Sequence, residues 1–169
     1  KAELFKQSGH YEKYKDDMIM AKSHYSEEEY FLKPMNCPQH CQIYASKSRS
    51  YRDLPIRYCD FANLFRDEKP GQLSGLSRLR CFAQDDGHCF CAEDQIKDEF
   101  NNVLGVIKEA LDTYKMKYHI RLSLWDPNQK DKYLGDEKTW ENAQNILREL
   151  LVENNIEFVE EEGEAAFYG

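Results

Sequence analysis

The sequence lacks several features that would place it in a specialised class of protein. No apolar run among its 169 residues approaches the ~18 residues of a membrane-spanning helix, and the first residues show no signal-peptide pattern. Internal repeats and low-complexity segments are missing too, which excludes collagen and coiled-coil proteins. With 41% hydrophobic and 13% aromatic residues, the chain is too apolar for a disordered protein. We therefore expect one globular domain over residues 1–169, with no membrane partner and a cytoplasmic location.

Features typical of a disulfide-stabilised protein are weak, although the chain has six cysteines. The chain is long and rich in lysine, so we expect reduced thiols. The cysteine spacings match no standard zinc finger. Two cysteines nevertheless lie close to histidines in the sequence, Cys37 near His40 and Cys89 next to His88.

A strong positive charge is also absent. The formal net charge is −8, which argues against a general nucleic-acid binder. The charge is unevenly distributed, because residues 136–169 hold ten acidic and two basic residues, whereas residues 45–80 hold eight basic and four acidic ones. The basic region suits an anionic ligand such as a phosphate group. The alternative is that both regions are ordinary solvated faces.

Hydrophobic periodicity predicts two long helices, over residues 93–115 and 136–154, the second with Asp136 as its N-cap. A shorter helix is expected from Asn36, as N-cap, to Ser46. Two strands, Ile56–Glu68 and Leu76–Phe90, should form a hairpin around residues 69–75, and shorter strands are expected near residues 29–33, 120–124 and 156–158. The predicted fold class is α+β, an antiparallel sheet flanked by helices.

The second hairpin strand has an unusually polar face. Alternation puts six of its side chains on one side, namely Arg78, Arg80, Phe82, Gln84, Asp86 and His88. On the first strand, Arg66 and Glu68 also share a face. Together they could form a charged surface that binds phosphate, stacks on a base and holds a metal. The alternative is an ordinary solvent-exposed sheet face. The P-loop, His-Glu-x-x-His and Gly-x-Ser-x-Gly motifs are all missing.

Five segments, taken in order, resemble the threonyl-tRNA synthetases, a family of class II aminoacyl-tRNA synthetases. They are Lys33–Pro38, Ser50–Pro55, Phe65–Glu68, Arg78–His88 and the residues 163–169. The hairpin, at about residues 57–90, resembles the class II motif 2. The contexts of Cys37 and His88 narrow the resemblance to the threonine enzymes. The family has a class II antiparallel sheet, which would be incomplete in this chain.

The resemblance implies an ATP site on the hairpin. Arg66 would bind the α-phosphate and the amino-acid carboxylate, and Arg78 would reach the γ-phosphate. Glu68 would accept a hydrogen bond from the adenine amino group, and Phe82 would stack on the adenine ring. Mg2+ would accompany ATP. Arg66 and Gln84 are the expected catalytic residues, for activation of L-threonine to threonyl-adenylate and its transfer to tRNA(Thr).

The resemblance also implies a zinc site. Cys37 and His88 match two of the three protein ligands, and the third would lie beyond residue 169. The zinc would take the amino and hydroxyl groups of threonine, which valine cannot reproduce. Three further residues would bind threonine, Asp86 at the hydroxyl, Gln84 at the carboxylate and Tyr168 at the amino group. Other nearby candidates are not expected to be ligands, namely His40, Cys41, Cys89 and Cys91.

The chain departs from the family mildly at Gln39, Asp67 and Gly87, and it lacks the arginine-bearing motif 3. We therefore expect residues 1–169 to be the N-terminal part of a class II catalytic domain, with little activity alone and a homodimer as the parent enzyme. One alternative is a non-catalytic synthetase-like paralogue or a truncated binding or regulatory module. Another is a sibling class II synthetase for serine or proline, in which Cys37 and His88 would bind no zinc.

Overall fold

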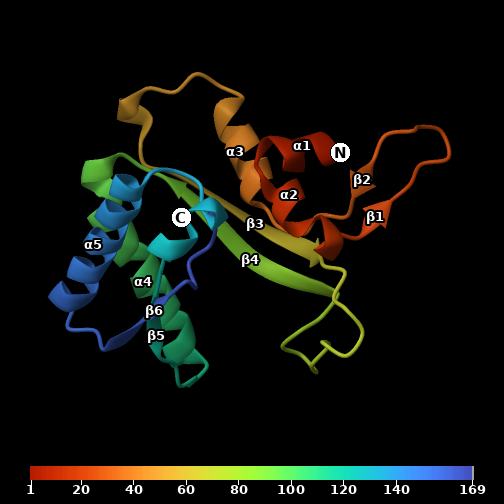
Figure 1. Cartoon of the computed structure of the whole chain (residues 1–169). Coiled ribbons are helices and arrows are strands. Elements are labelled where there is room, and N and C mark those ends of the chain that lie inside the picture. The colour runs from red at the N-terminus through yellow and green to blue at the C-terminus, as the bar shows by residue number, and fades with distance from the viewer. Residues whose placement is uncertain (169) are drawn as a thin grey trace. The chain divides into compact units, whose positions relative to one another are not determined.

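The computed structural model describes residues 1–168 and divides into two compact units, residues 1–92 and the residues from Glu93 onward (Figure 1). Each unit is described by itself. The expectation of a single domain over residues 1–169 stays a prediction. Among the described residues, no helix combines the length and the apolar character that crossing a membrane requires.

The first unit is built around one long antiparallel hairpin. Strands β3 (Ile56–Phe65) and β4 (Cys81–Phe90) pair along their whole length, from Ile56 opposite Phe90 to Phe65 opposite Cys81. The remaining elements of this unit are α1 (Ala2–Gln7), α2 (His10–Tyr14), η1 (Lys15–Asp17), β1 (Met20–Ala21), β2 (Tyr30–Phe31), α3 (Cys37–Ala45) and η2 (Tyr51–Asp53). Figure 1 shows α1, α2 and α3 beside this hairpin.

Both hairpin strands are shorter than the sequence predicts. Residues 66–80 lie outside the strands, although one bond from the Arg66 N–H to the Arg80 carbonyl oxygen (3.0 Å) extends the ladder. The ladder stops there because the next backbone N–H, that of Asp67, donates to the Asp17 carbonyl oxygen at 2.9 Å and not to β4. Pro70, which cannot donate, and Gly71, with a φ of 88°, then lie in the connecting loop. Strand alternation therefore does not place Glu68 or Arg78, contrary to the prediction, and Arg66 and Arg80 lie one position beyond the strand ends.

The two faces of the hairpin differ in how far they are buried. On β3, Ala62 and Leu64 are buried, whereas Phe61 points to the opposite face and is 81% exposed. Because the register pairs even-numbered residues with even-numbered ones, Phe82, Asp86 and His88 share the covered face, where each is half-buried. Arg78, Arg80 and Gln84 of the same predicted face are exposed, so the polar face that the sequence singles out is only partly covered.

Helix α3 begins at Cys37, as predicted, but the predicted capping bond is wrong. The Asn36 side chain makes no cap hydrogen bond, and its Nδ2 instead donates to Asp86 Oδ2 at 3.0 Å. By contrast, the cap of α5 (Glu137–Glu153) is confirmed, since the Thr139 N–H donates to Asp136 Oδ1 at 2.9 Å. This bond holds the pKa of the Asp136 carboxyl below its usual value.

The second unit contains η3 (Glu93–Gln95), α4 (Ile96–Thr113), β5 (Ile120–Leu124), η4 (Pro127–Lys132), α5 and β6 (Phe158–Glu162). Strands β5 and β6 pair in parallel, a pairing that the predicted antiparallel sheet did not include. The reason is the connection, because η4 and α5 carry the chain back to the start of the neighbouring strand. The α+β class, with small antiparallel sheets and helices, is confirmed.

An aromatic cluster forms the core of the second unit. Trp125, Tyr133 and Trp140 are buried together, with the two indole rings stacked at a centroid distance of 6.1 Å. The Trp140 Nε1–H also donates to the Leu134 carbonyl oxygen at 2.7 Å. This bond ties the segment before α5 to the helix itself.

We predict that Trp140→Phe lowers the free energy of unfolding by about 1 kcal/mol more than Trp125→Phe, because only the first change also removes a hydrogen bond. Trp125 is the matched control, since it is buried in the same cluster and its hydrogen bond, to Gln144 Oε1, comes from the backbone N–H and survives the change. Urea unfolding followed by far-ultraviolet circular dichroism measures both losses. Equal losses would show that the Trp140 bond contributes nothing.

Candidate ATP and amino-acid site on the hairpin

A hollow of about 640 Å3 lies where the hairpin strands meet their connecting loop. Five of the nine predicted site residues line it, namely Arg66, Glu68, Arg78, Phe82 and Gln84. They come from the end of β3, the loop and the start of β4. The antiparallel pairing is what brings these distant segments of the sequence together.

Glu68 holds the loop at this hollow. Its carboxylate accepts a hydrogen bond from Arg78 Nε at 2.9 Å, and its side chain is only 13% exposed. Its carbonyl oxygen accepts two more from Arg80, from Nε at 3.1 Å and from Nη2 at 2.8 Å. A carboxylate has two oxygens, so the Glu68 oxygen that does not bind Arg78 can accept a hydrogen bond from a ligand.

The Arg66 guanidinium lies over the Phe82 ring, with its carbon 5.1 Å from the ring centroid. This cation–π contact covers one face of the ring and holds the positive charge at the mouth of the hollow. A planar ligand ring could then stack only on the other face of Phe82. Arg66 is itself exposed, so its donors can reach an anion.

Helix α3 follows β4 through three successive contacts. Asn36 donates to Asp86 at 3.0 Å, and the Nδ1 atoms of His40 and His88 lie 2.7 Å apart. One turn further on, the rings of Tyr44 and Phe90 stack at 4.3 Å. We call these three pairs the α3–β4 contact line.

Burial and two residues of the contact line, Asp86 and His40, affect the charge state of the His88 imidazole. Burial lowers the pKa of the His88 imidazole, the charge of Asp86 opposes that shift, and His40 adds to it. A lowered pKa favours the neutral ring, which is the form that binds metals. With Nδ1 engaged by His40, Nε2 is the nitrogen left for a metal ion.

The residues present fit a zinc ion as part of a ligand set. Cys37 begins α3, between Asn36 and His40, the first two of the three residues that contact β4. A thiolate with an imidazole is a common pair of zinc ligands. Within residues 1–168, no group of three or more His, Cys, Asp or Glu side chains could hold a metal ion. The third ligand, expected beyond residue 169, stays a prediction.

The other cysteines lie elsewhere. Cys89 is on the opposite face of β4 from His88, as alternation predicts, and Cys91 follows the end of the strand. Cys41, Cys59, Cys81 and Cys89 are exposed, whereas Cys37 and Cys91 are half-buried.

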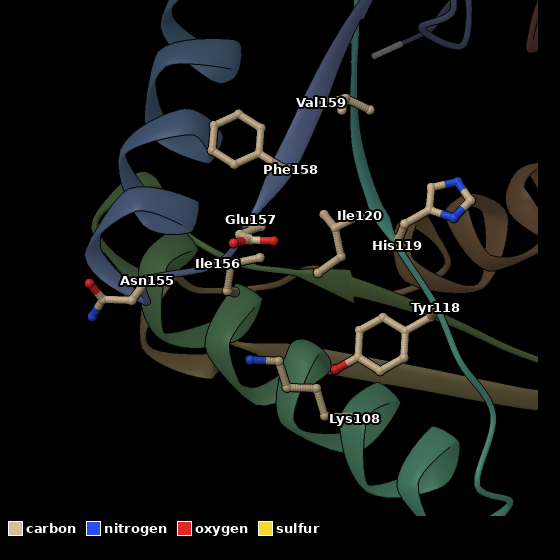
Figure 2. Close-up of a pocket in the computed structure, with 9 residues that line it drawn as sticks. All are labelled: Lys108, Tyr118, His119, Ile120, Asn155, Ile156, Glu157, Phe158 and Val159. Atoms are coloured by element: carbon tan, nitrogen blue, oxygen red, sulfur yellow. The ribbon is translucent and has the colours of Figure 1, made fainter.

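Tyr168 belongs to the second unit, where its ring makes an edge contact with Phe167 at 4.9 Å. A larger hollow of about 930 Å3 lies in the same unit among α4, β5 and β6. Figure 2 shows Tyr118 turned toward Lys108 across it, with His119 turned away. None of the nine predicted site residues lines this hollow, so size alone does not identify the site.

Sequence reasoning missed two residues that shape the site, Asn36 and His40. The sequence analysis interpreted Asn36 as a helix cap and considered His40 only as a metal ligand, which it did not expect. Their spacing of four residues puts them on one helix face, and Asp86 and His88 share one strand face. Comparing the helix spacing with the strand spacing could have predicted the pairs Asn36–Asp86 and His40–His88.

The chain belongs to the family of the tRNA synthetase class II core domain (G, H, P, S and T), whose model matches residues 19–168. This agrees with the motif 2 resemblance of the hairpin. Within the family, the relatives it resembles are threonine–tRNA ligases. It is 45% identical to the enzyme of Clostridium perfringens and 48% identical to that of Rubrobacter xylanophilus, over 100% and 98% of this chain.

The chain spans about a quarter of these curated relatives, 27% and 26% of their lengths. A solved structure described as the RNA binding domain of threonyl-tRNA synthetase from Cryptosporidium parvum matches with a TM-score of 0.90 and 38% identity. The match covers 99% of this chain and 40% of that one. The predicted resemblance to threonyl-tRNA synthetases is therefore confirmed.

We predict that a thiol-alkylating reagent labels Cys41, Cys59, Cys81 and Cys89 several-fold faster than Cys37, because the first four thiols are exposed. Peptide mapping by mass spectrometry of samples quenched over time measures the order. Urea-unfolded chain is the control, in which the six rates should converge. Fast labelling of Cys37 in the folded chain would contradict its half-buried position.

Proposed function

We propose that this chain supplies the ATP-binding hairpin and two zinc ligands of a threonine–tRNA ligase. In the enzyme that carries it, threonine would be activated with ATP to threonyl-adenylate and then transferred to tRNA(Thr). The observation that carries the proposal is the hollow at the end of the hairpin, which gathers five predicted ATP and threonine residues. The similarity to threonine–tRNA ligases over the whole chain supports it.

In the activation step, a carboxylate oxygen of threonine attacks the α-phosphorus of ATP, and pyrophosphate leaves. No proton has to move, so positioning and charge neutralisation decide the rate. Arg66 would bring the two anions together, through its contact with both the α-phosphate and the carboxylate. Gln84, two residues after Phe82 on β4, would bind the same carboxylate. Mg2+ accompanying ATP would supply further positive charge to the phosphates.

The nucleotide would be held from two sides. Its adenine would stack on the face of Phe82 that Arg66 leaves uncovered, with its amino group donating to the second oxygen of Glu68. Arg78 would exchange its bond with Glu68 for the γ-phosphate. Because Arg78 lies in the loop outside the strand, this exchange breaks no ladder bond.

Threonine recognition would depend on the α3 side of the hairpin. Cys37 and His88 would hold zinc, which when bound takes the amino and hydroxyl groups of threonine as ligands and so excludes valine. Asp86 would accept from the threonine hydroxyl, and Tyr168 would contact the amino group. The homodimer and the cytoplasmic location belong to the same proposal. The described residues offer no observation that favours a non-catalytic paralogue.

We predict that a full-length protein carrying this chain catalyses threonine-dependent ATP–pyrophosphate exchange, and that Arg66→Ala reduces its rate by about 10²- to 10³-fold, because charge neutralisation at the α-phosphate is lost. Lys69→Ala is the matched control, since Lys69 carries the same charge on the same loop but does not line the hollow. Exchange that depends on serine or proline instead, or none at all, would reject the proposal.

A further inference from the structure

We infer that Asn36 and His40 are positioning residues, which orient Asp86 and His88 toward threonine and zinc. What Asp86 and His88 bind rests on the proposed function, but the orientation itself rests on the contact line. Asn36 is 1% exposed and His40 is 4% exposed, so neither can contact bulk solvent. Each makes a side-chain hydrogen bond to one of these two β4 residues.

The spacing of the two elements makes this arrangement possible. Four residues of an α-helix rise about 6.0 Å, and two residues of a strand rise about 6.8 Å. Positions 36, 40 and 44 of the helix can therefore meet positions 86, 88 and 90 of the strand in succession. The pairing is a register between helix and strand, and it determines which α3 side chain reaches which β4 side chain.

Asn36 is an unfavourable choice if stability alone matters. It precedes a helix but makes no cap bond, and its Oδ1 is buried without a hydrogen-bond partner among residues 1–168. Such an acceptor is costly, so the residue needs another reason. Its Nδ2 donates to Asp86 Oδ2, which leaves Asp86 Oδ1 for the substrate hydroxyl. The unpaired Asn36 oxygen beside it can accept from a donor that arrives with the substrate.

The histidine pair admits two arrangements of one proton. Two Nδ1 atoms 2.7 Å apart share a single hydrogen, so one ring donates and the other accepts. We assign the donor to His88, because a metal-binding histidine commonly donates its other N–H to a second group. Its Nε2 lone pair is then available for zinc. In the reverse arrangement His88 would carry its proton on Nε2, which blocks the metal.

Ring ¹⁵N NMR of the 169-residue chain tests this assignment directly. We expect the Nδ1–H tautomer for His88 and the Nε2–H tautomer for His40. The opposite pair of tautomers would overturn the assignment. This readout needs neither zinc nor activity, so it stays decisive if the proposed function fails.

In the full-length protein, we predict that His40→Ala weakens zinc binding by about 10- to 100-fold, measured by competition with a chromogenic chelator. His40→Asn should restore much of the affinity, because its side-chain oxygen can accept from His88 Nδ1–H. Tyr44→Leu is the matched control, since it alters the same contact line away from the metal and should leave zinc affinity unchanged. Unchanged affinity in His40→Ala, or equal loss in Tyr44→Leu, would reject a specific role for His40.

We further predict that Asn36→Ala raises the KM for threonine about 10-fold, with the KM for ATP nearly unchanged, because Asp86 loses the bond that orients it. Asn36→Asp should be worse, since it sets two carboxylates against each other. Steady-state ATP–pyrophosphate exchange measures both constants. Equal effects on threonine and ATP would indicate a merely structural role, whereas no exchange by the unmutated protein would reject the proposed function instead.

Discussion

The register between α3 and β4 is the constraint on which the candidate site depends. Three contacts, each one helical turn and two strand residues further along, hold the helix against the covered face of the hairpin. A shift by one residue on the strand would turn its side chains to the other face, and a shift by one residue on the helix would rotate its contacts by about 100°. Both shifts would break the contacts of Asn36 with Asp86 and of His40 with His88. The site can therefore exist in only one alignment of these elements.

Much of the fold follows from local signals in the sequence. The periodicity of residues 93–115 and 136–154 and the alternation in the hairpin strands predict the elements found there, and the Asp136 cap is as expected. The strand ends were predicted too far into the loop, because polar residues such as Arg78 continue the alternation by chance. The ladder stops earlier, where the Asp67 N–H donates to Asp17 instead of to β4. The parallel pairing of β5 with β6 was missed, since it depends on the path of α5 and not on either strand.

The site residues also divide into those that local sequence signals predict and those that depend on tertiary packing. Arg66, Glu68 and Phe82 could be grouped from the sequence, because hairpin pairing is a local property. The role of Asn36 could not, since a helix-capping pattern and a buried contact to Asp86 use the same residue type. Tertiary packing selected the second use. A capping assignment from sequence assumes that the side chain has no better partner elsewhere, and Asp86 is a charged partner that lies fifty residues away.

The placement of the arginines separates fixed from exchangeable groups. Arg66 follows the end of β3, where a backbone bond to Arg80 and the ring of Phe82 hold it in place. Arg78 lies in the loop, where its backbone pairs with Ser74 and its side chain forms an ion pair with Glu68. A phosphate could replace that ion pair. Arg80 meanwhile binds the Glu68 carbonyl oxygen, so the backbone of Glu68 stays in position when its carboxylate changes partner. In the proposed mechanism, the hairpin thus fixes the groups that would align the reacting atoms. It leaves outside the ladder the cation, Arg78, that would exchange an internal anion for the nucleotide.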